Sequence, residues 1–196
     1  MATTTPSKRT RRPATKAKAK KSTTTRAAVR TPRPTGAQAA GSRVPEIDTA
    51  DAERTIDILQ DRLVALLDLQ LTLKHVHWNV TGPNFIAVHE MLDPQVTAAR
   101  AMSDAVAERI ATCGGSPKGT PGAVVDARSW NDYDLGRAST TKHLTKLDEV
   151  YQGVTDSHRA AVDELGDLDP VSEDLLTGQL GELELFAWFI RSHLGT

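Results

Sequence analysis

Along most of the chain, apolar residues return every three to four positions, which is the spacing of a helix with one buried face. Four long segments show this pattern, and they predict helices over residues 49–78, 84–112, 133–165 and 170–193. No segment alternates apolar and polar residues in the way that a half-buried strand requires. The pattern therefore predicts an all-α protein.

The predicted helices have capping residues at their starts. Asp48, Asn84 and Asp169 stand at N-cap positions, where a short polar side chain can accept a hydrogen bond from a backbone N–H group. The connection between the second and third helices covers residues 115–131, with a possible short helix at 123–127. Four helices with a long central crossover are typical of a ferritin-like bundle.

One motif of the known di-iron bundles is missing. Ferritins and related di-iron bundles bind metal inside one subunit through Glu-x-x-His pairs. Neither Glu-x-x-His nor Asp-x-x-His occurs anywhere in this sequence. The spacing therefore disfavours an ordinary ferritin or an intra-bundle di-iron oxygenase.

Four potential metal ligands lie on the second predicted helix. His89 and Asp93 are four residues apart, as are Asp104 and Glu108, so each pair shares one helix face. Asp93 and Asp104 also lie on one stripe, because eleven residues make almost three turns, but they are about 16 Å apart along the axis. Ligand bonds to first-row metals are about 2 Å long, so one ion cannot reach both pairs of one helix.

Two copies of this helix could complete the site together. If they cross antiparallel about a two-fold axis, the first pair of one copy faces the second pair of the other, which gives two equivalent sites. An isolated acidic pair is usually a solvated helix face, but these carboxylates share their stripe with a histidine on a mostly apolar helix. Imidazole and carboxylate suit ferrous iron, with zinc and manganese as competitors.

A fifth ligand candidate, His77, ends the preceding helix. Residues 81–84 read Thr-Gly-Pro-Asn, which predicts a turn that brings His77 back beside His89. His75 lies two residues earlier, about 200° around the helix, so it faces another way. We interpret His75 as a structural or surface residue.

The string HWNVTGPNFIAVHEMLD, followed by DAVAER, resembles the Dps family (DNA-binding proteins from starved cells), and the resemblance extends over residues 46–195. It implies a ferroxidase site with ligands His77, His89 and Asp93 from one subunit and Asp104 and Glu108 from its two-fold mate. It also implies a hollow dodecamer that oxidises iron, preferably with hydrogen peroxide, and stores the ferric mineral. Trp78 matches a family tryptophan that is oxidised beside the site in place of more valuable groups.

Pro94 departs from the usual family pattern directly after a ligand. Proline removes one helical hydrogen bond and clashes with the carbonyl group of Glu90, so we expect a kink that tunes the orientation of Asp93.

Charge divides the chain into two regions. Residues 1–45 hold 12 Lys and Arg and no acidic residue, whereas residues 46–196 hold 12 basic and 25 acidic residues, a balance of −13. The first region cannot bury a core, so we expect a disordered tail followed by one ferritin-like domain.

We expect this tail to bind DNA independently of base sequence and in a salt-sensitive way. The residues that we assign to DNA binding are Lys8, Arg9, Arg11, Arg12, Lys16, Lys18, Lys20 and Lys21. The alternative is that the tail assists solubility or assembly.

Acidic residues also gather where the third and fourth helices meet. They are candidates for an iron-entry pore: Asp167, Asp169, Glu173 and Asp174. The competing interpretation is that they stabilise the dipole of a helix N-terminus.

Other features of the sequence bear on where in the cell the protein is located. The tail lacks the apolar stretch of a secretory signal, and a single cysteine, Cys113, fits a reducing compartment. A cytoplasmic, nucleoid-associated protein is expected, with a transit peptide as the minority alternative. For function, the alternative to a ferroxidase cage is a nucleoid-compacting protein whose iron site is weak because of Pro94.

Overall fold

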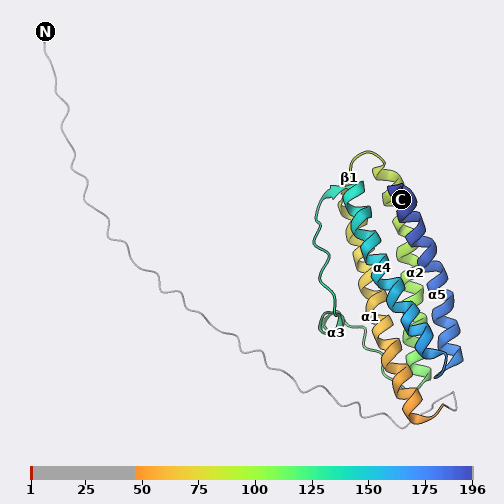
Figure 1. Cartoon of the computed structure of the whole chain (residues 1–196). Helices are drawn as coiled ribbons and strands as arrows, with labels where there is room; N and C mark the ends of the chain where they lie inside the picture. Colours follow the sequence, from red (N-terminus) through yellow and green to blue (C-terminus); the bar gives the residue numbers. More distant parts are fainter. Residues whose placement is uncertain (2–46, 196) are drawn as a thin grey trace. The chain divides into compact units, whose positions relative to one another are not determined.

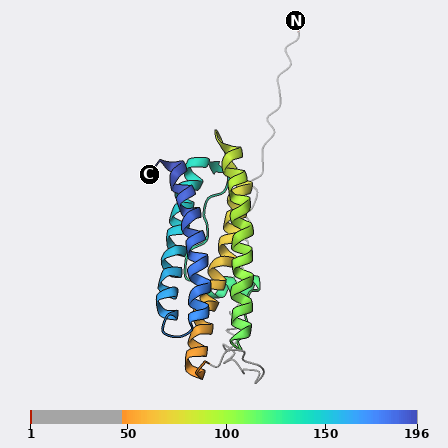
Figure 2. The same ribbon diagram turned by 90° about the vertical axis from the view of Figure 1, so that its right-hand side faces the viewer.

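The computed structural model of the protein describes Met1 and residues 47–195. Its helices are α1 (Thr49–Asn79), α2 (Phe85–Thr112), α3 (Pro121–Ala127), α4 (Thr140–Leu165) and α5 (Pro170–Leu194). The four long helices stand side by side in one bundle, and the short α3 lies outside it (Figures 1 and 2). The all-α prediction and the short helix within the crossover are confirmed.

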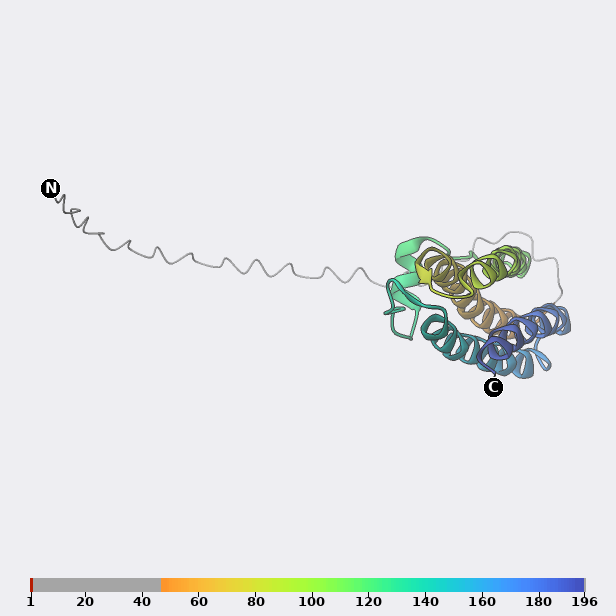
Figure 3. The same ribbon diagram turned by 90° about the horizontal axis from the view of Figure 1, so that it is seen from above.

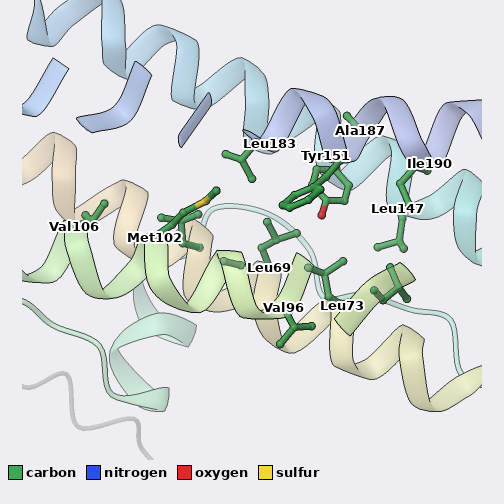
Figure 4. Packing of buried hydrophobic residues seen from close by; sticks show 14 of the residues in the cluster. Leu69, Leu73, Val96, Met102, Val106, Leu147, Tyr151, Leu183, Ala187 and Ile190 are labelled. Carbon is green, nitrogen blue, oxygen red and sulfur yellow. The ribbon is translucent and has the colours of Figure 1, made fainter. Parts of the chain in front are cut away.

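The bundle consists of two helix pairs. α1 packs mainly against α2, and α4 packs mainly against α5; Figure 3 shows both pairs from the end of the bundle. Leucines from α1 and α4 meet α5 residues in the centre, as Figure 4 shows for Leu73, Leu147 and Ile190. All three side chains are fully buried, and burial of each contributes about 2 kcal/mol to folding.

The third long helix begins later than the sequence pattern indicated. α4 starts at Thr140 rather than at residue 133, and the Ser139 side chain accepts a hydrogen bond from the Lys142 backbone N–H group at 3.4 Å. The chain before it is not helical, because β2 (Ala138–Ser139) pairs in parallel with β1 (Val80–Thr81). This two-residue bridge is too short to produce an alternating pattern in the sequence.

The crossover is also fixed to the outside of α1. The indole N–H group of Trp130 donates to Asp68 at 2.8 Å, and Arg128 donates to the same carboxylate at 3.1 Å. These contacts join residues about sixty positions apart, so the local helical period could not reveal them.

The capping predictions had mixed outcomes. Asp48 accepts a hydrogen bond from the backbone of Ala50 at 2.9 Å, as expected of an N-cap. Asn84 precedes α2 but makes no capping hydrogen bond with its side chain. Asn84 is the N-cap residue of α2, as predicted, but its backbone has φ 62°, the left-handed conformation that asparagine tolerates in turns.

Pro94, where we expect a kink, lies inside the second helix. α2 continues through Pro94 from Phe85 to Thr112. The next residue, Gln95, is buried and accepts a hydrogen bond from Tyr151 at 2.6 Å, so packing against α4 holds this turn in place. Among the described residues, no helix is long and apolar enough to cross a membrane.

His158 is a fully buried histidine on α4. Burial, together with the positive charge of Arg62, lowers its pKa to about 4 from the ordinary 6.5. Gln179 of α5 is its hydrogen-bond partner, at 3.5 Å from Nε2, and Gln179 in turn donates to the Met102 carbonyl group of α2. The imidazole is therefore neutral in the folded protein over a pH range in which an unfolded chain takes up a proton.

This difference predicts acid sensitivity of the fold. Between pH 6.5 and pH 4 only the unfolded state protonates at His158, so folding stability should fall by roughly 3 kcal/mol as the pH decreases through this window. The folding stability of the H158Q variant should not show this decrease of roughly 3 kcal/mol. The H193Q variant, changed at an exposed histidine, should show it as the wild type does. Denaturant unfolding at several pH values measures the effect, and parallel stability profiles for wild type and H158Q would contradict it.

Candidate metal centre

Two histidines bind each other's backbone where α1 turns into α2. His77 Nδ1 lies 2.9 Å from the His89 carbonyl oxygen, and His89 Nδ1 lies 2.9 Å from the His77 carbonyl oxygen. Their rings stack with centroids 3.6 Å apart, and Phe85 packs against the ring of His89. The reversal predicted from the Thr-Gly-Pro-Asn turn is confirmed, because His77 does return to His89.

These hydrogen bonds determine the protonation of both rings. A carbonyl oxygen can only accept, so Nδ1 of each imidazole carries the proton, and Nε2 keeps its lone pair. Donation from one ring nitrogen to a carbonyl group is the usual way in which proteins orient a metal-ligating histidine. Both histidines are thus prepared to bind a metal ion through Nε2.

Asp93 lies one helical turn after His89. Its Oδ1 atom is 3.3 Å from His77 Nδ1 and accepts a hydrogen bond from Lys74 Nζ at 2.6 Å. The hydrogen bond from Lys74 lowers the pKa of Asp93, and the nearby histidines act in the same direction, whereas burial opposes them. Asp93 is therefore ionised at neutral pH, with the ammonium group of Lys74 as its counter-ion.

Lys74 was not recognised from the sequence. It stands three residues before His77 on α1, a spacing that puts both side chains on one face of the helix. That spacing was the available signal, but an isolated lysine near a helix end is common and usually solvated. Only the packing of α2 against α1 shows that Lys74 reaches the proposed ligand.

The remaining carboxylate candidates lie farther along α2. Asp104 and Glu108 are exposed, and the axial rise of about 16 Å between Asp93 and Asp104 separates them from the histidines. Within residues 47–195, no three His, Cys, Asp or Glu side chains are arranged to hold a metal ion. One chain brings His77, His89 and Asp93 near one another without forming a complete metal site, and it leaves the second pair apart.

Asp104 opens onto a groove with a volume of about 840 Å³ between α1, α2 and the connection after α2. Leu63, Leu67 and Ala107 contribute apolar surface to its wall, and Arg100 and Gln70 contribute polar groups. An exposed carboxylate in a groove with apolar and polar walls is a surface that can accept another chain.

Two further residues, Trp78 and His75, flank His77 closely in the sequence but differ from each other in their surroundings. Trp78 is 71% exposed, so oxidants in solution can reach its indole ring. His75 donates from Nε2 to the Leu135 carbonyl oxygen at 2.7 Å and fixes the crossover, in agreement with the structural role expected of it.

Comparisons with known proteins show the family to which the chain belongs. Residues 56–196 match the family model of the ferritin-like domain. The DNA protection during starvation protein of Mycolicibacterium smegmatis is 54% identical over 151 residues, which cover 77% of this chain and 82% of that protein. This chain belongs to the Dps family of ferritin-like proteins.

Solved structures of Dps proteins have the same fold. The tetragonal form of Mycobacterium smegmatis Dps superimposes with a TM-score of 0.77 at 53% identity, covering 79% of this chain and 93% of that one. DpsA14 from Streptomyces coelicolor gives a TM-score of 0.77 at 59% identity, covering 78% and 91%. Dps proteins in general oxidise and store iron and form oligomeric cages. The ferritin-like bundle predicted from the sequence is thereby confirmed.

The acidic residues at the α4–α5 junction of this Dps chain have unequal environments. Asp167 and Asp174 are exposed, and Glu173 is partly buried. Asp169 is only 4% exposed, and it caps α5 by accepting hydrogen bonds from the backbone of Val171 and Ser172 at 3.4 and 3.3 Å. Three of the four pore candidates thus retain carboxylates that solvent can reach.

Asp169 also binds a cation of its own chain. Arg109 of α2 donates to its Oδ2 atom at 2.5 Å, and the Ser172 hydroxyl group donates to the same oxygen. Burial raises the pKa of Asp169, but hydrogen bonds from Arg109 and Ser172 outweigh burial and place the pKa below its ordinary value. This carboxylate already joins α2 to the start of α5.

We expect Asp169 to act in folding rather than in iron entry. The D169A variant loses the cap of α5 and leaves Arg109 without its partly buried partner, so it should be destabilised by about 3 kcal/mol. Variant D174A, changed at an exposed carboxylate, should unfold within about 0.5 kcal/mol of wild type. Urea unfolding measures both, and equal stability of the two variants would refute the structural role.

Proposed function

We propose that this protein is a ferroxidase and iron-storage cage that oxidises Fe²⁺, preferably with hydrogen peroxide, and protects DNA from oxidative damage. Each site would form between two subunits related by a two-fold axis. His77, His89 and Asp93 would come from one subunit, and Asp104 and Glu108 would come from the other. The cage would be a dodecamer built from six such dimers.

The observation that carries this proposal is the half-site at the start of α2. Two imidazoles present free Nε2 lone pairs beside an ionised carboxylate, and two more carboxylates lie about 16 Å away on the same helix. A symmetric antiparallel contact would place the histidines and Asp93 of one subunit beside Asp104 and Glu108 of the other, and it would do so twice in each dimer. Nitrogen and oxygen ligands of this kind suit ferrous iron.

Iron binding would change the partner of Asp93. A ferrous ion replaces the ammonium group of Lys74 as counter-ion of this carboxylate, so Lys74 must move away as the site fills. Carboxylates from both subunits then stabilise the ferric product more than the ferrous substrate, because its charge is higher. Hydrogen peroxide accepts two electrons, so its reduction by two ferrous ions releases no hydroxyl radical.

Other residues would protect the site and supply it. Exposed Trp78 would be oxidised by any radical that escapes, as proposed from the resemblance. Asp167, Glu173 and Asp174 would supply carboxylates to an iron-entry route, while Asp169 is occupied by Arg109.

Complementation between two defective subunits tests the shared site. H89A and D104A each remove a ligand from a different half, so each homo-oligomer should lose ferrous oxidation. When the two variants are refolded together, mixed dimers should regain one intact site out of two. Stopped-flow absorbance after anaerobic ferrous loading and peroxide addition measures this recovery.

A mixture with no more activity than either variant alone would exclude a site shared in this way. The matched control is a mixture of H89A with H77A, both changed in the same half, which should recover nothing.

We propose that DNA binding resides in the tail of residues 1–45, most of which lie outside the described residues. A domain with a balance of −13 repels phosphate, so the 12 basic residues of the tail must supply the attraction. The name of the Mycolicibacterium smegmatis relative, a DNA protection protein, supports a role on DNA. Several tails on one cage would add their weak contacts and hold the protein on the nucleoid in the cytoplasm.

Removal of residues 2–43 tests the tail. The truncated protein should no longer retard DNA in a gel, because it has lost all 12 basic residues of the tail. Its ferrous oxidation should match that of the full chain, since no proposed ligand is removed. Retardation by the full chain should weaken as salt increases, and retardation retained by the truncated protein at low salt would refute the assignment.

A second candidate function is DNA compaction with weak ferroxidase activity. The ion pair between Lys74 and Asp93 favours it, because this pair competes with iron for a ligand. Peroxide consumption after ferrous loading separates the two functions. A ratio of two ferrous ions oxidised per peroxide supports the ferroxidase.

A further inference from the structure

A phenol and an imidazole form an isolated pair beside the half-site. The Tyr133 hydroxyl group lies 2.9 Å from His143 Nδ1, and the two rings are nearly parallel, with an interplanar angle of 6°. His143 is fully buried, and Tyr133 is partly buried. We propose that Tyr133 and His143 are a reversible, proton-coupled redox pair that quenches one-electron oxidants produced at the iron site. This inference rests on the proposed ferroxidase function.

The protonation of the pair suits this role. Burial lowers the pKa of His143, although the carbonyl groups of Asn79 and Gly136 oppose this effect, and burial also raises the pKa of Tyr133. Both groups are therefore neutral at physiological pH, and in the tautomer with the imidazole proton on Nε2 the phenol donates to the lone pair of Nδ1. A phenol that loses an electron becomes strongly acidic, so a base within hydrogen-bond reach makes the oxidation easier.

The backbone around His143 also bears on its tautomer. The carbonyl groups of Asn79 and Gly136 raise the pKa of His143 as hydrogen-bond acceptors, although Nε2 has no partner of good geometry in the described part of the chain. Because a carbonyl group can only accept, these contacts require a proton on the imidazole, and the phenol can then donate to the other ring nitrogen.

The location of the pair connects it to iron. Tyr133 meets the edge of the His75 ring, with centroids 5.7 Å apart, and His75 lies two residues before the proposed ligand His77 on α1. The carbonyl group of Asn79, two residues after that ligand, faces His143. The pair thus packs against the same end of α1 that carries the half-site.

The other tyrosine of the chain has no such partner. Tyr151 is fully buried and donates at 2.6 Å to the side-chain oxygen of Gln95. An amide oxygen accepts a hydrogen bond but is too weak a base to remove the proton. The two tyrosines therefore form a natural comparison within one protein.

In the proposed reaction, Tyr133 is first oxidised and then reduced again. If one ferrous ion reduces hydrogen peroxide alone, the products are Fe³⁺, hydroxide and hydroxyl radical. An electron from Tyr133 then reduces this radical to hydroxide, while the phenol proton moves to His143 Nδ1, which leaves a tyrosyl radical beside an imidazolium. A second ferrous ion returns an electron to Tyr133, His143 returns the proton, and a second Fe³⁺ forms.

Rapid freezing and electron paramagnetic resonance test the pair. The full chain is loaded anaerobically with ferrous iron at less than the site capacity, mixed with excess peroxide and frozen, with ring-deuterated tyrosine to identify the signal. A tyrosyl radical is expected in wild type and in Y151F, and it should be lost in Y133F. In H143Q the phenol remains but its base is gone, so the signal should also be lost. Radical that persists in Y133F or is unchanged in H143Q overturns the proposal.

Oxidation without iron separates this inference from the proposed function. A flash-generated ruthenium oxidant added to metal-free protein should produce a radical that depends on Tyr133 and forms more slowly in heavy water. Absence of that radical overturns the pair, whatever the iron site does. Absence of ferrous oxidation in a protein that gives the flash-induced radical would instead count against the ferroxidase.

Discussion

The reciprocal hydrogen bonds between His77 and His89 are the constraint on which the functional end of the molecule depends. They close the turn between α1 and α2 at a defined separation, and they fix the proton of each imidazole on Nδ1. Each bond contributes about 1 kcal/mol to stability, but the geometric effect is larger. Because the backbone carbonyl groups are themselves the acceptors, the ligand atoms cannot be misoriented without unwinding the ends of two helices.

Much of this end could be predicted from the sequence, because the helical period and a four-residue turn are local signals. The start of α4 could not be predicted locally, because Ser139 pairs with Thr81 nearly sixty residues away. Lys74 was missed for a related reason, since its contact with Asp93 exists only when α2 lies against α1. The proposal that a second chain completes the site rests on the distance between Asp93 and Asp104 along one helix, and a single chain does not reveal that contact.

Pro94 illustrates how packing outweighs a local disruption. The proline removes one backbone hydrogen bond from α2, yet the helix is continuous on both sides of it. Gln95, directly after it, is bound by the hydroxyl group of Tyr151, and Leu92, two residues before it, is fully buried. Packing contacts on both sides of Pro94 stabilise this turn and offset the free-energy cost of the missing backbone hydrogen bond. The side chain of Asp93 is consequently positioned by Lys74 and His77.

Histidine has two opposite uses at this end of the bundle, and hydrogen-bond partners decide between them. At His77 and His89 a carbonyl oxygen requires Nδ1 to hold its proton, so these rings offer a lone pair at Nε2 to a cation. At His143 the partner is a phenol, which can donate, so Nδ1 offers its lone pair to a proton instead. Under the proposed function, histidines that look equivalent in sequence thus divide into metal ligands and a base. An iron site that produces oxidants needs both kinds, because a ligand binds the substrate and a nearby base allows an aromatic ring to be oxidised without leaving an unstable cation.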